Sequence, residues 1–193
     1  MFHRSLVLIV LAIVLLSSAC RHNPDVEKQA ALERGNGYFA QKKYAEATIE
    51  YRKAIQEDMR FGEAHYRLGL AYEQLGDRAS ALREFGNAAN VLPDRKEVQL
   101  KAGQYYLFAS RFDEARKVAE RLLDKDVRNV DAQLLLANAL AGLNDLDAAA
   151  RQVEEAIRME PSNPAGYSNL AAVELARGNV DKAEAAFRNA MTI

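Results

Sequence analysis

The sequence has few of the residues that build disulfide frameworks, metal sites and nucleic-acid interfaces. Its 193 residues include one cysteine, three histidines and no tryptophan. A single cysteine cannot form an internal disulfide, and His22 and His65 have no partner at the spacing typical of a metal site. The formal net charge is -1, so the chain lacks the excess of positive charge that nucleic-acid binding requires. These absences argue against a bound metal and a nucleic-acid partner.

No arrangement of residues in the sequence is typical of catalysis or of cofactor binding. The glycine-rich stretch 35–37 has no strand pattern before it, and no lysine follows at the spacing of a phosphate loop. Asp124, Asp126 and Asp131 surround an expected turn without the pattern of a calcium loop. We therefore predict a protein that is not an enzyme and carries no cofactor.

Residues 1–19 differ in kind from the rest of the chain. Arg4 supplies one positive charge, Leu6 to Leu16 is an uninterrupted apolar run of eleven residues, and residues 17–19 are small. This order is typical of a secretory signal peptide. A membrane-spanning helix needs about 20 apolar residues, so the run is short for a permanent anchor.

Cys20 follows the small residues directly. This arrangement resembles the lipobox of bacterial lipoproteins, in which the cysteine is lipidated and becomes the new N-terminus, although Ser17 stands where that family usually has leucine. The resemblance implies lipidation of Cys20 and a periplasm-facing lipoprotein of the bacterial envelope. Arg21, in place of aspartate, favours the outer membrane. An ordinary signal peptide with a free thiol and an uncleaved anchor remain as alternatives.

The stretch between this cysteine and the main body of the chain is polar and contains a proline. We expect residues 20–27 to form the lipidated N-terminus and a short tether. Asp25 is the predicted cap of the first helix.

The rest of the chain is organised by a unit that is clearest from Gly62 to Arg95. Its first half places residues three and four apart on one helix face: His65, Leu68, Gly69 and Tyr72. Its second half does the same with Ala81, Phe85 and Ala88. Gly76 and Asp77 predict the end of one helix and the N-cap of the next, and Pro93 ends the second. The unit therefore predicts a helix–turn–helix hairpin.

The pattern recurs every 34 residues without insertion or deletion. The twentieth position of every unit is alanine: Ala47, Ala81, Ala115, Ala149 and Ala183. The eighth is always small: Gly35, Gly69, Gly103, Ala137 and Ala171. Period and pattern together resemble the tetratricopeptide repeat over residues 28–193. The resemblance implies an all-α, right-handed superhelical solenoid of about five hairpins, with repeats at 28–61, 62–95, 96–129, 130–163 and 164–193.

Small residues at these positions have a mechanical role, since glycine inside a helix costs about 1 kcal/mol relative to alanine. We expect Gly69 to let the two helices approach closely, with Ala81 facing it and Tyr72 and Phe85 filling the space beside the contact. The third repeat exchanges small and large residues at Ala119 and Leu122, which predicts slightly altered packing there. The fourth position lacks the tryptophan that is commonest in the family.

The resemblance also implies a concave groove, lined by the first helices, that binds a partner protein or peptide. The residues at the groove positions form an apolar and aromatic set with a few polar groups: Leu32, Asn36, Phe39, Tyr66, Leu70, Glu73, Gln104, Leu107, Phe108 and Asn138. Leu100, Leu134, Ser168 and Leu175 occupy equivalent positions. For Phe39, Tyr66 and Phe108 an alternative is packing between repeats, and this alternative is favoured for Leu100 and Leu134. The lysine of the family's carboxylate clamp is absent.

These features predict a non-enzymatic, lipid-anchored scaffold in an envelope assembly such as a pilus, a secretion system or a polysaccharide exporter. The fifth repeat carries no polar capping helix before Ile193, and such arrays usually have one. This observation motivates two further hypotheses. The chain is the N-terminal regulatory region of a longer protein, which could be an enzyme, or it self-associates through its last repeat.

Overall fold

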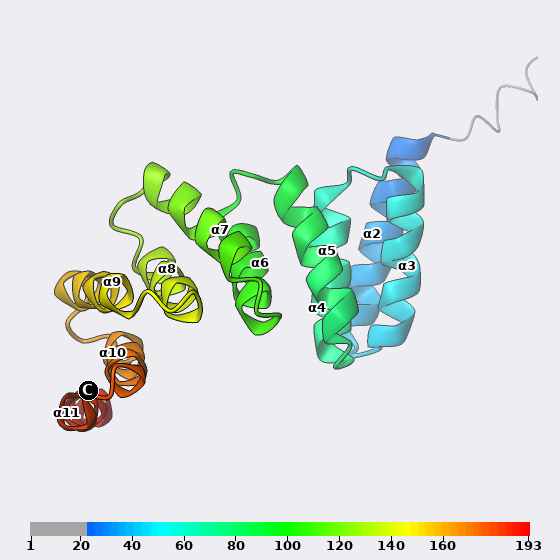
Figure 1. Ribbon diagram of the computed structural model, residues 1–193. Coiled ribbons are helices and arrows are strands. Elements are labelled where there is room, and N and C mark those ends of the chain that lie inside the picture. The colour runs from blue at the N-terminus through cyan, green and yellow to red at the C-terminus, as the bar shows by residue number, and fades with distance from the viewer. Residues whose placement is uncertain (1–22) are drawn as a thin grey trace, which may run out of the picture.

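The computed structural model describes residues 23–193, so the signal peptide predicted at 1–19 and the lipidation predicted at Cys20 lie outside the described residues. Within this range the chain is all α-helical, and the helices follow one another along an arch (Figure 1). The helices are α2 (Pro24–Ala40), α3 (Tyr44–Glu57), α4 (Gly62–Gln74), α5 (Arg78–Val91), α6 (Lys96–Phe108), α7 (Phe112–Lys125), α8 (Val130–Gly142), α9 (Leu146–Met159), α10 (Pro164–Ala176) and α11 (Val180–Thr192).

Successive helices form antiparallel hairpins that stack side by side. Each even-numbered helix contacts the odd-numbered helix that follows it, and α3, α5, α7 and α9 each contact the first helix of the next hairpin. In addition α2 contacts α4, α6 contacts α8, and α8 contacts α10. The even-numbered helices therefore run next to one another along one side of the solenoid. We call the solvent-facing side of these five helices the inner face.

The turn inside each hairpin requires a left-handed residue at the fifteenth position of the repeat. The backbone φ is 75° at Gly76 and 80° at Gly178, and it is 60° at Lys42, 57° at Ser110 and 65° at Asn144. This confirms that Gly76 ends a helix, because glycine adopts this conformation at no steric cost. The other three turns make the same shape with residues that carry a Cβ, which is less favourable.

Asparagine and aspartate side chains cap several helices. The Asp77 carboxylate accepts a hydrogen bond from the backbone N–H of Ser80 at 3.0 Å, as predicted from the sequence. At the start of the array the prediction that Asp25 is the cap is wrong. Asn23 is the cap, accepting from the N–H of Asp25 at 3.1 Å, because Pro24 fits the first helical position, where no N–H is needed. Residues 24–27 of the predicted tether are therefore helical.

The core lies between the helices of each hairpin and depends on the small residues. All five alanines at the twentieth position are buried. A Cβ added at Gly69 would lie 2.7 Å from two ring carbons of Phe85, and one added at Gly35 would lie 2.5 Å from the Tyr51 ring. The missing side chain thus admits an aromatic ring from the second helix. This extends the predicted role of the glycine, because the ring lies directly against it.

The third repeat departs from this arrangement because Ala119 occupies the position of the aromatic ring. The space left at Gly103 is filled by Leu135, which belongs to α8 of the following repeat. Leu135 is 4% exposed and shares a core cluster with Ala119 and Leu122. The altered packing expected here is thus a link between two repeats, which share one core.

Polar side chains at the fourth position of the repeat bind carbonyl groups at the end of the preceding helix or in the loop that follows it. The Gln99 amide donates to the carbonyl oxygens of Ala89 at 2.7 Å and of Leu92 at 3.1 Å, and Gln133 donates to Val127 O at 3.2 Å. These bonds satisfy carbonyl groups at a helix end or in the loop that follows it, groups that helix geometry leaves unpaired. The position that usually holds tryptophan in the family thus joins successive repeats through hydrogen bonds.

His65 occupies the fourth position of the second repeat. It bonds to the loop of the preceding repeat and also forms a buried ion pair with Glu84. Its Nδ1 lies 2.7 Å from Glu84 Oε2, and its Nε2 lies 3.1 Å from the Met59 carbonyl oxygen. When Glu84 is ionised, its carboxylate and the Met59 carbonyl group can accept hydrogen bonds but cannot donate them. Both ring nitrogens of His65 must then donate, so His65 is an imidazolium. Burial alone would lower the pKa of His65, but the bonds to Glu84 and Met59 outweigh it and raise the pKa.

Candidate functional site

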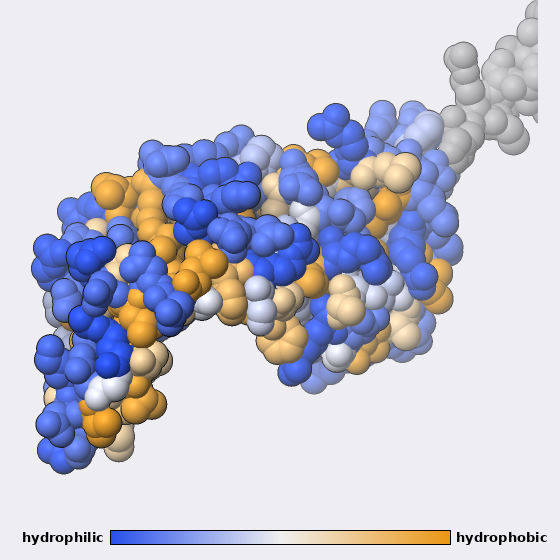
Figure 2. Space-filling model, viewed as in Figure 1, coloured by the Kyte–Doolittle hydropathy of each residue, from blue (hydrophilic) through white to orange (hydrophobic). Residues whose placement is uncertain are grey.

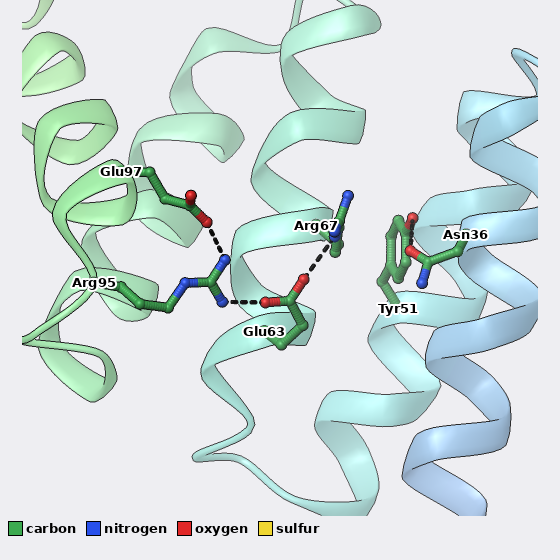
Figure 3. A network of polar contacts seen from close by, with 6 residues as sticks. All are labelled: Asn36, Tyr51, Glu63, Arg67, Arg95 and Glu97. Carbon is green, nitrogen blue, oxygen red and sulfur yellow. Dashed lines mark hydrogen bonds and ion pairs between the residues drawn. The ribbon is translucent and has the colours of Figure 1, made fainter.

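The N-terminal half of the inner face carries a network of charged side chains centred on Arg95 (Figure 3). Arg95 lies between α5 and α6 and pairs with both Glu63 of α4 and Glu97 of α6. Glu63 also accepts a hydrogen bond from Arg67 at 2.7 Å. The Arg95 guanidinium stands 5.4 Å from the centre of the Tyr66 ring. The network thus connects the second and third repeats across the surface on which the groove was predicted.

A second set of polar contacts joins the same two repeats further along the inner face. Lys101 of α6 pairs with the Glu73 carboxylate of α4 at 3.0 Å. The Tyr105 hydroxyl donates to the same carboxylate at 3.0 Å. Burial and then the Glu73 carboxylate raise the pKa of Tyr105 to about 12, so this hydroxyl keeps its proton at neutral pH.

The ionisation of Glu63 follows from its two arginine partners. Burial would raise the pKa of this carboxyl group, but the hydrogen bonds from Arg95 and Arg67 lower it overall. The carboxylate is therefore charged at neutral pH and fully engaged within the protein. A ligand that needs Arg95 or Arg67 would first have to displace Glu63.

The predicted groove residues of the first repeat are largely occupied by contacts within the protein. Leu32 is buried in the core of the first two repeats. The Asn36 side-chain oxygen accepts a hydrogen bond from the Tyr51 hydroxyl at 3.0 Å (Figure 3). Phe39 is half-buried and meets the Tyr44 ring edge to face at a centroid distance of 5.1 Å. These three residues offer little free surface.

The predicted residues of the second repeat are half-buried and held by neighbours. Tyr66 packs against Phe85 with a centroid distance of 5.8 Å, and Leu70 packs on the core cluster that contains Phe85. Glu73 is engaged by Lys101 and Tyr105. Tyr66 combines the two alternatives, packing within the protein and lying on the inner face. Its ring packs against Phe85 of the core and also lies close to the Arg95 guanidinium of the surface network.

The predicted residues of the third and fourth repeats are more open. Gln104 is exposed, and Phe108 is 60% exposed with the Arg78 guanidinium 4.7 Å from its ring centre. Leu107 and Asn138 are half-buried. Among the described residues the side chains of Gln104 and Asn138 have no hydrogen-bond partner, so both amides can accept and donate to a ligand.

The remaining groove positions divide in the same way. Leu134 is buried and Leu100 is half-buried, and packing between repeats had been favoured for both. Ser168 and Leu175 are exposed on α10. The open part of the inner face therefore lies towards the C-terminal repeats.

Sequence reasoning missed the charged residues of the inner face: Glu63, Arg67, Arg95, Glu97 and Lys101. Their signal was present, since Glu63 and Glu97 share the second position of the repeat and Arg67 and Lys101 share the sixth. Side chains of opposite charge on the inner-face sides of α4 and α6 are expected to pair.

A hollow of about 420 Å³ lies on another side of the solenoid, between α5, α6 and α7. It is lined by Asn90, Tyr106, Glu114, Lys117, Val118, Glu120, Arg121 and Asp124. None of these is a predicted groove residue. Glu114 is paired with Arg111 and Glu120 with Arg116, so several of its charges already have partners.

Within residues 23–193 no group of three histidine, cysteine, aspartate or glutamate side chains is arranged to hold a metal ion. No helix in the same range has the length and apolarity needed to cross a membrane.

Comparison with protein families supports the repeat assignment. A family model described as "Tetratricopeptide repeat" matches residues 100–157 and 134–191. A model described as "TPR repeat" matches residues 35–76, and a third, again "Tetratricopeptide repeat", matches residues 63–94. The chain belongs to the tetratricopeptide repeat (TPR) family. The curvature of such repeat arrays creates the extended concave surfaces with which proteins of this kind bind partners.

Curated relatives contain similar TPR stretches in much longer chains. The DnaJ homolog subfamily C member 7 homolog of Schizosaccharomyces pombe is 28% identical over 155 residues, which cover 71% of this chain and 32% of that protein. Superkiller complex protein 3 of Mus musculus is 34% identical over 88 residues, covering 43% of this chain and 6% of that protein. This chain thus spans a minor part of the length of these relatives.

Solved structures share the fold over most of the chain. MamA from Desulfovibrio magneticus RS-1 superposes with a TM-score of 0.73 at 17% identity, covering 86% of this chain and 94% of that one. YrrB superposes with a TM-score of 0.70 at 18% identity, covering 84% of each chain. At these identities the likeness concerns the solenoid alone.

Proposed function

We propose that this TPR chain is a non-enzymatic scaffold that holds a partner protein or peptide against its inner face. The observation that carries the proposal is the open surface of the even-numbered helices from α6 onwards. Gln104 and Phe108 are exposed on α6 and Leu175 is exposed on α10, and the Gln104 amide has no hydrogen-bond partner among the described residues. Apolar and aromatic groups on such a face mark interaction sites. The structure of YrrB is described as that of a TPR protein with an unusual peptide-binding site, which agrees with this use of the fold.

The proposal includes a lipid anchor at Cys20 and a place in the bacterial envelope. The leader sequence, with a positive residue, an apolar run and small residues in that order, and the cysteine directly after it support a periplasm-facing lipoprotein, with the outer membrane favoured. There the scaffold would serve an envelope assembly such as a pilus, a secretion system or a polysaccharide exporter. Anchoring at the N-terminus leaves the inner face free for a partner.

Binding on the inner face is tested with Phe108→Ala in cells that express the full chain. The ring is mostly exposed, so its loss should leave the fold intact. Ile49→Ala on α3 is the matched control, since Ile49 is also exposed, at 50%, and lies outside the inner face and the last repeat. Partners are captured by chemical cross-linking and quantified. We expect reduced recovery for Phe108→Ala only, and equal recovery for both variants and the native protein would contradict the proposal.

The anchor is tested separately by feeding cells a palmitate analogue. Label is expected on the native protein and absent from a Cys20→Ser variant. Label retained by Cys20→Ser would remove lipidation at this residue from the proposal.

An alternative is that the chain is the N-terminal regulatory TPR region of a longer protein, in which any catalysis would take place in a further domain. The observation in its favour is that the curated relatives are several times longer than the stretch they share with this chain. Reading the gene beyond the codon for Ile193 tests it directly. An open reading frame that continues into a further domain supports the alternative, and a stop codon there refutes it.

Self-association through the last repeat is a further part of the proposal. Helix α11 exposes Phe187, and Met191 is 86% exposed. Sedimentation of the detergent-solubilised full chain should show a mass that rises with concentration. A monomer at every concentration would contradict this part.

A further inference from the structure

The two halves of the inner face differ sharply in charge. Helices α4 and α6 carry Glu63, Arg67 and Glu73, and Lys96, Glu97 and Lys101. Helices α8 and α10 together carry two charged residues, Asp131 and Glu174. A partner lying along the whole inner face would therefore meet two different chemical environments.

Neither charge of α8 and α10 reaches the middle of the inner face. Asp131 lies in the first turn of α8, at the end of the helix. Glu174 is 3% exposed and is held by Arg177 at 2.8 Å and by Asn179 at 2.6 Å. Glu174 is thus turned into the protein and paired.

The exposed side of α10 is continuous and uncharged. Ala165, Ser168, Ala172 and Leu175 follow at intervals of three or four residues, and all four are exposed. Residues at these intervals lie on one helix face. Leu175 is 55% exposed, which leaves a bulky apolar group uncovered beside small ones.

Helix α8 continues this surface towards the centre of the arch. Asn138 and Ala141 precede Ala172 and Leu175 by one repeat of 34 residues, and α8 contacts α10, so the two pairs point to the same side. We call these residues with Ser168 the neutral stretch. Figure 2 shows hydrophobic side chains (orange) along the inner curve in this part of the molecule, with hydrophilic residues over the outer surface.

The polar groups of the neutral stretch are uncharged and free. Among the described residues the side chains of Asn138 and Ser168 have no hydrogen-bond partner. An amide and a hydroxyl both donate and accept, which matches the N–H and C=O groups of a peptide backbone. An acyl chain would bury them without partners, and a charged side chain would lose its water without gaining a counter-ion.

We propose that the neutral stretch binds an uncharged, apolar peptide segment of the partner protein. The segment packs a bulky side chain over Ala172 and against Leu175, and its backbone bonds to Asn138 and Ser168. In the N-terminal half, Arg95, Arg67 and Lys101 are paired with carboxylates of the protein itself, so a charged ligand would have to displace those carboxylates to bind them. This inference rests on the proposed function and names the chemistry of its ligand.

The test places a charge of either sign on the neutral stretch. Ala172→Glu and Ala172→Lys both introduce good helix formers on an exposed face, so the fold should be retained. Ala185→Glu and Ala185→Lys, on the exposed side of α11, are the matched controls. The detergent-solubilised full chain is applied to an array of synthetic peptides that covers all charge states, and affinities are measured for the peptides that bind.

We expect the native chain to select uncharged, apolar peptides. Both Ala172 variants should lose affinity for them by roughly tenfold or more, since an unpaired buried charge costs more than the free energy of a tenfold change in affinity. The Ala185 variants should bind as the native chain does.

Three results would overturn the inference in distinguishable ways. If Ala172→Lys strengthens binding and Ala172→Glu weakens it, or the reverse, the ligand is charged. If neither variant changes the affinity for peptides that do bind, the neutral stretch is not the site, although the proposed peptide binding stands. If the native chain binds no peptide, the proposed function fails together with the inference.

Discussion

Replacing Gly69 by alanine should destabilise the protein, although alanine is the better helix former. The added methyl carbon would lie 2.7 Å from two ring carbons of Phe85. Phe85 is fully buried, and its ring lies between Tyr66 and Tyr105 with centroid distances of 5.8 and 4.8 Å. The ring therefore has little free space into which it can move.

Two opposing terms set the size of the effect. Overpacking of a filled core costs about 1–3 kcal/mol, whereas glycine to alanine inside a helix gains about 1 kcal/mol. The net loss in free energy of unfolding for Gly69→Ala should be up to about 2 kcal/mol. Gly37→Ala is the matched control. Gly37 is exposed in α2 and an added methyl meets nothing within 4 Å, so this change should gain about 0.5–1 kcal/mol.

The assay is urea unfolding of the detergent-solubilised chain followed by circular dichroism. Midpoints are compared, because repeat arrays do not always unfold in a single step. Gly69→Ala should lower the midpoint and Gly37→Ala should raise it. Combining Gly69→Ala with Phe85→Leu should cost less than the sum of the two single changes, because the smaller side chain makes room for the methyl group. Equal stabilisation by both alanine variants would refute the packing argument.

Three further predictions follow from other contacts. Leu135→Ala should cost about 2–5 kcal/mol in urea unfolding, because Leu135 fills the space at Gly103, and a cost no larger than that of exposed Leu143→Ala would contradict this. Lys42→Gly should raise the free energy of unfolding by roughly 1 kcal/mol, because glycine adopts the left-handed conformation of this turn without the steric cost of a Cβ. A lower midpoint of urea unfolding would refute this. The raised pKa of His65 means that its stabilisation is complete below its ordinary pKa of about 6.5 and is lost as the pH rises through its folded-state value. The unfolding midpoint should fall over that range, and the same fall in His65→Gln would contradict the assignment.

The fold could be predicted from the sequence because its geometric requirements repeat. Alanine at the twentieth position and a small residue at the eighth are needed wherever two helices of a hairpin meet closely. Gly76 and Asp77 marked a turn for reasons that are local to the chain. Each of these signals appears at a fixed spacing, so a single unit such as 62–95 was enough to identify the others.

The contacts between repeats could not be predicted in the same way. Leu135 fills the space at Gly103 only because Ala119 leaves it empty, and that match joins residues of different repeats. Arg95 lies in a loop, and the repeat pattern does not say which carboxylates it meets. The candidate groove residues were assigned from their position in the repeat alone. Phe108 is exposed, which is one of the two alternatives left open for it, while Leu32 is buried in a core that the repeat position does not reveal.

The central claim is that the inner face holds the partner, and site-specific photo-cross-linking in cells tests it most directly. A photoreactive amino acid is placed at Gln104 or Ala172 on the inner face, and at Lys117 on α7 or Ala185 on α11 as outer controls, all of which are exposed. We predict that both inner positions yield the same cross-linked partner and that the outer positions do not. Cross-links to that partner from Lys117 or Ala185, with none from Gln104 and Ala172, would contradict the claim.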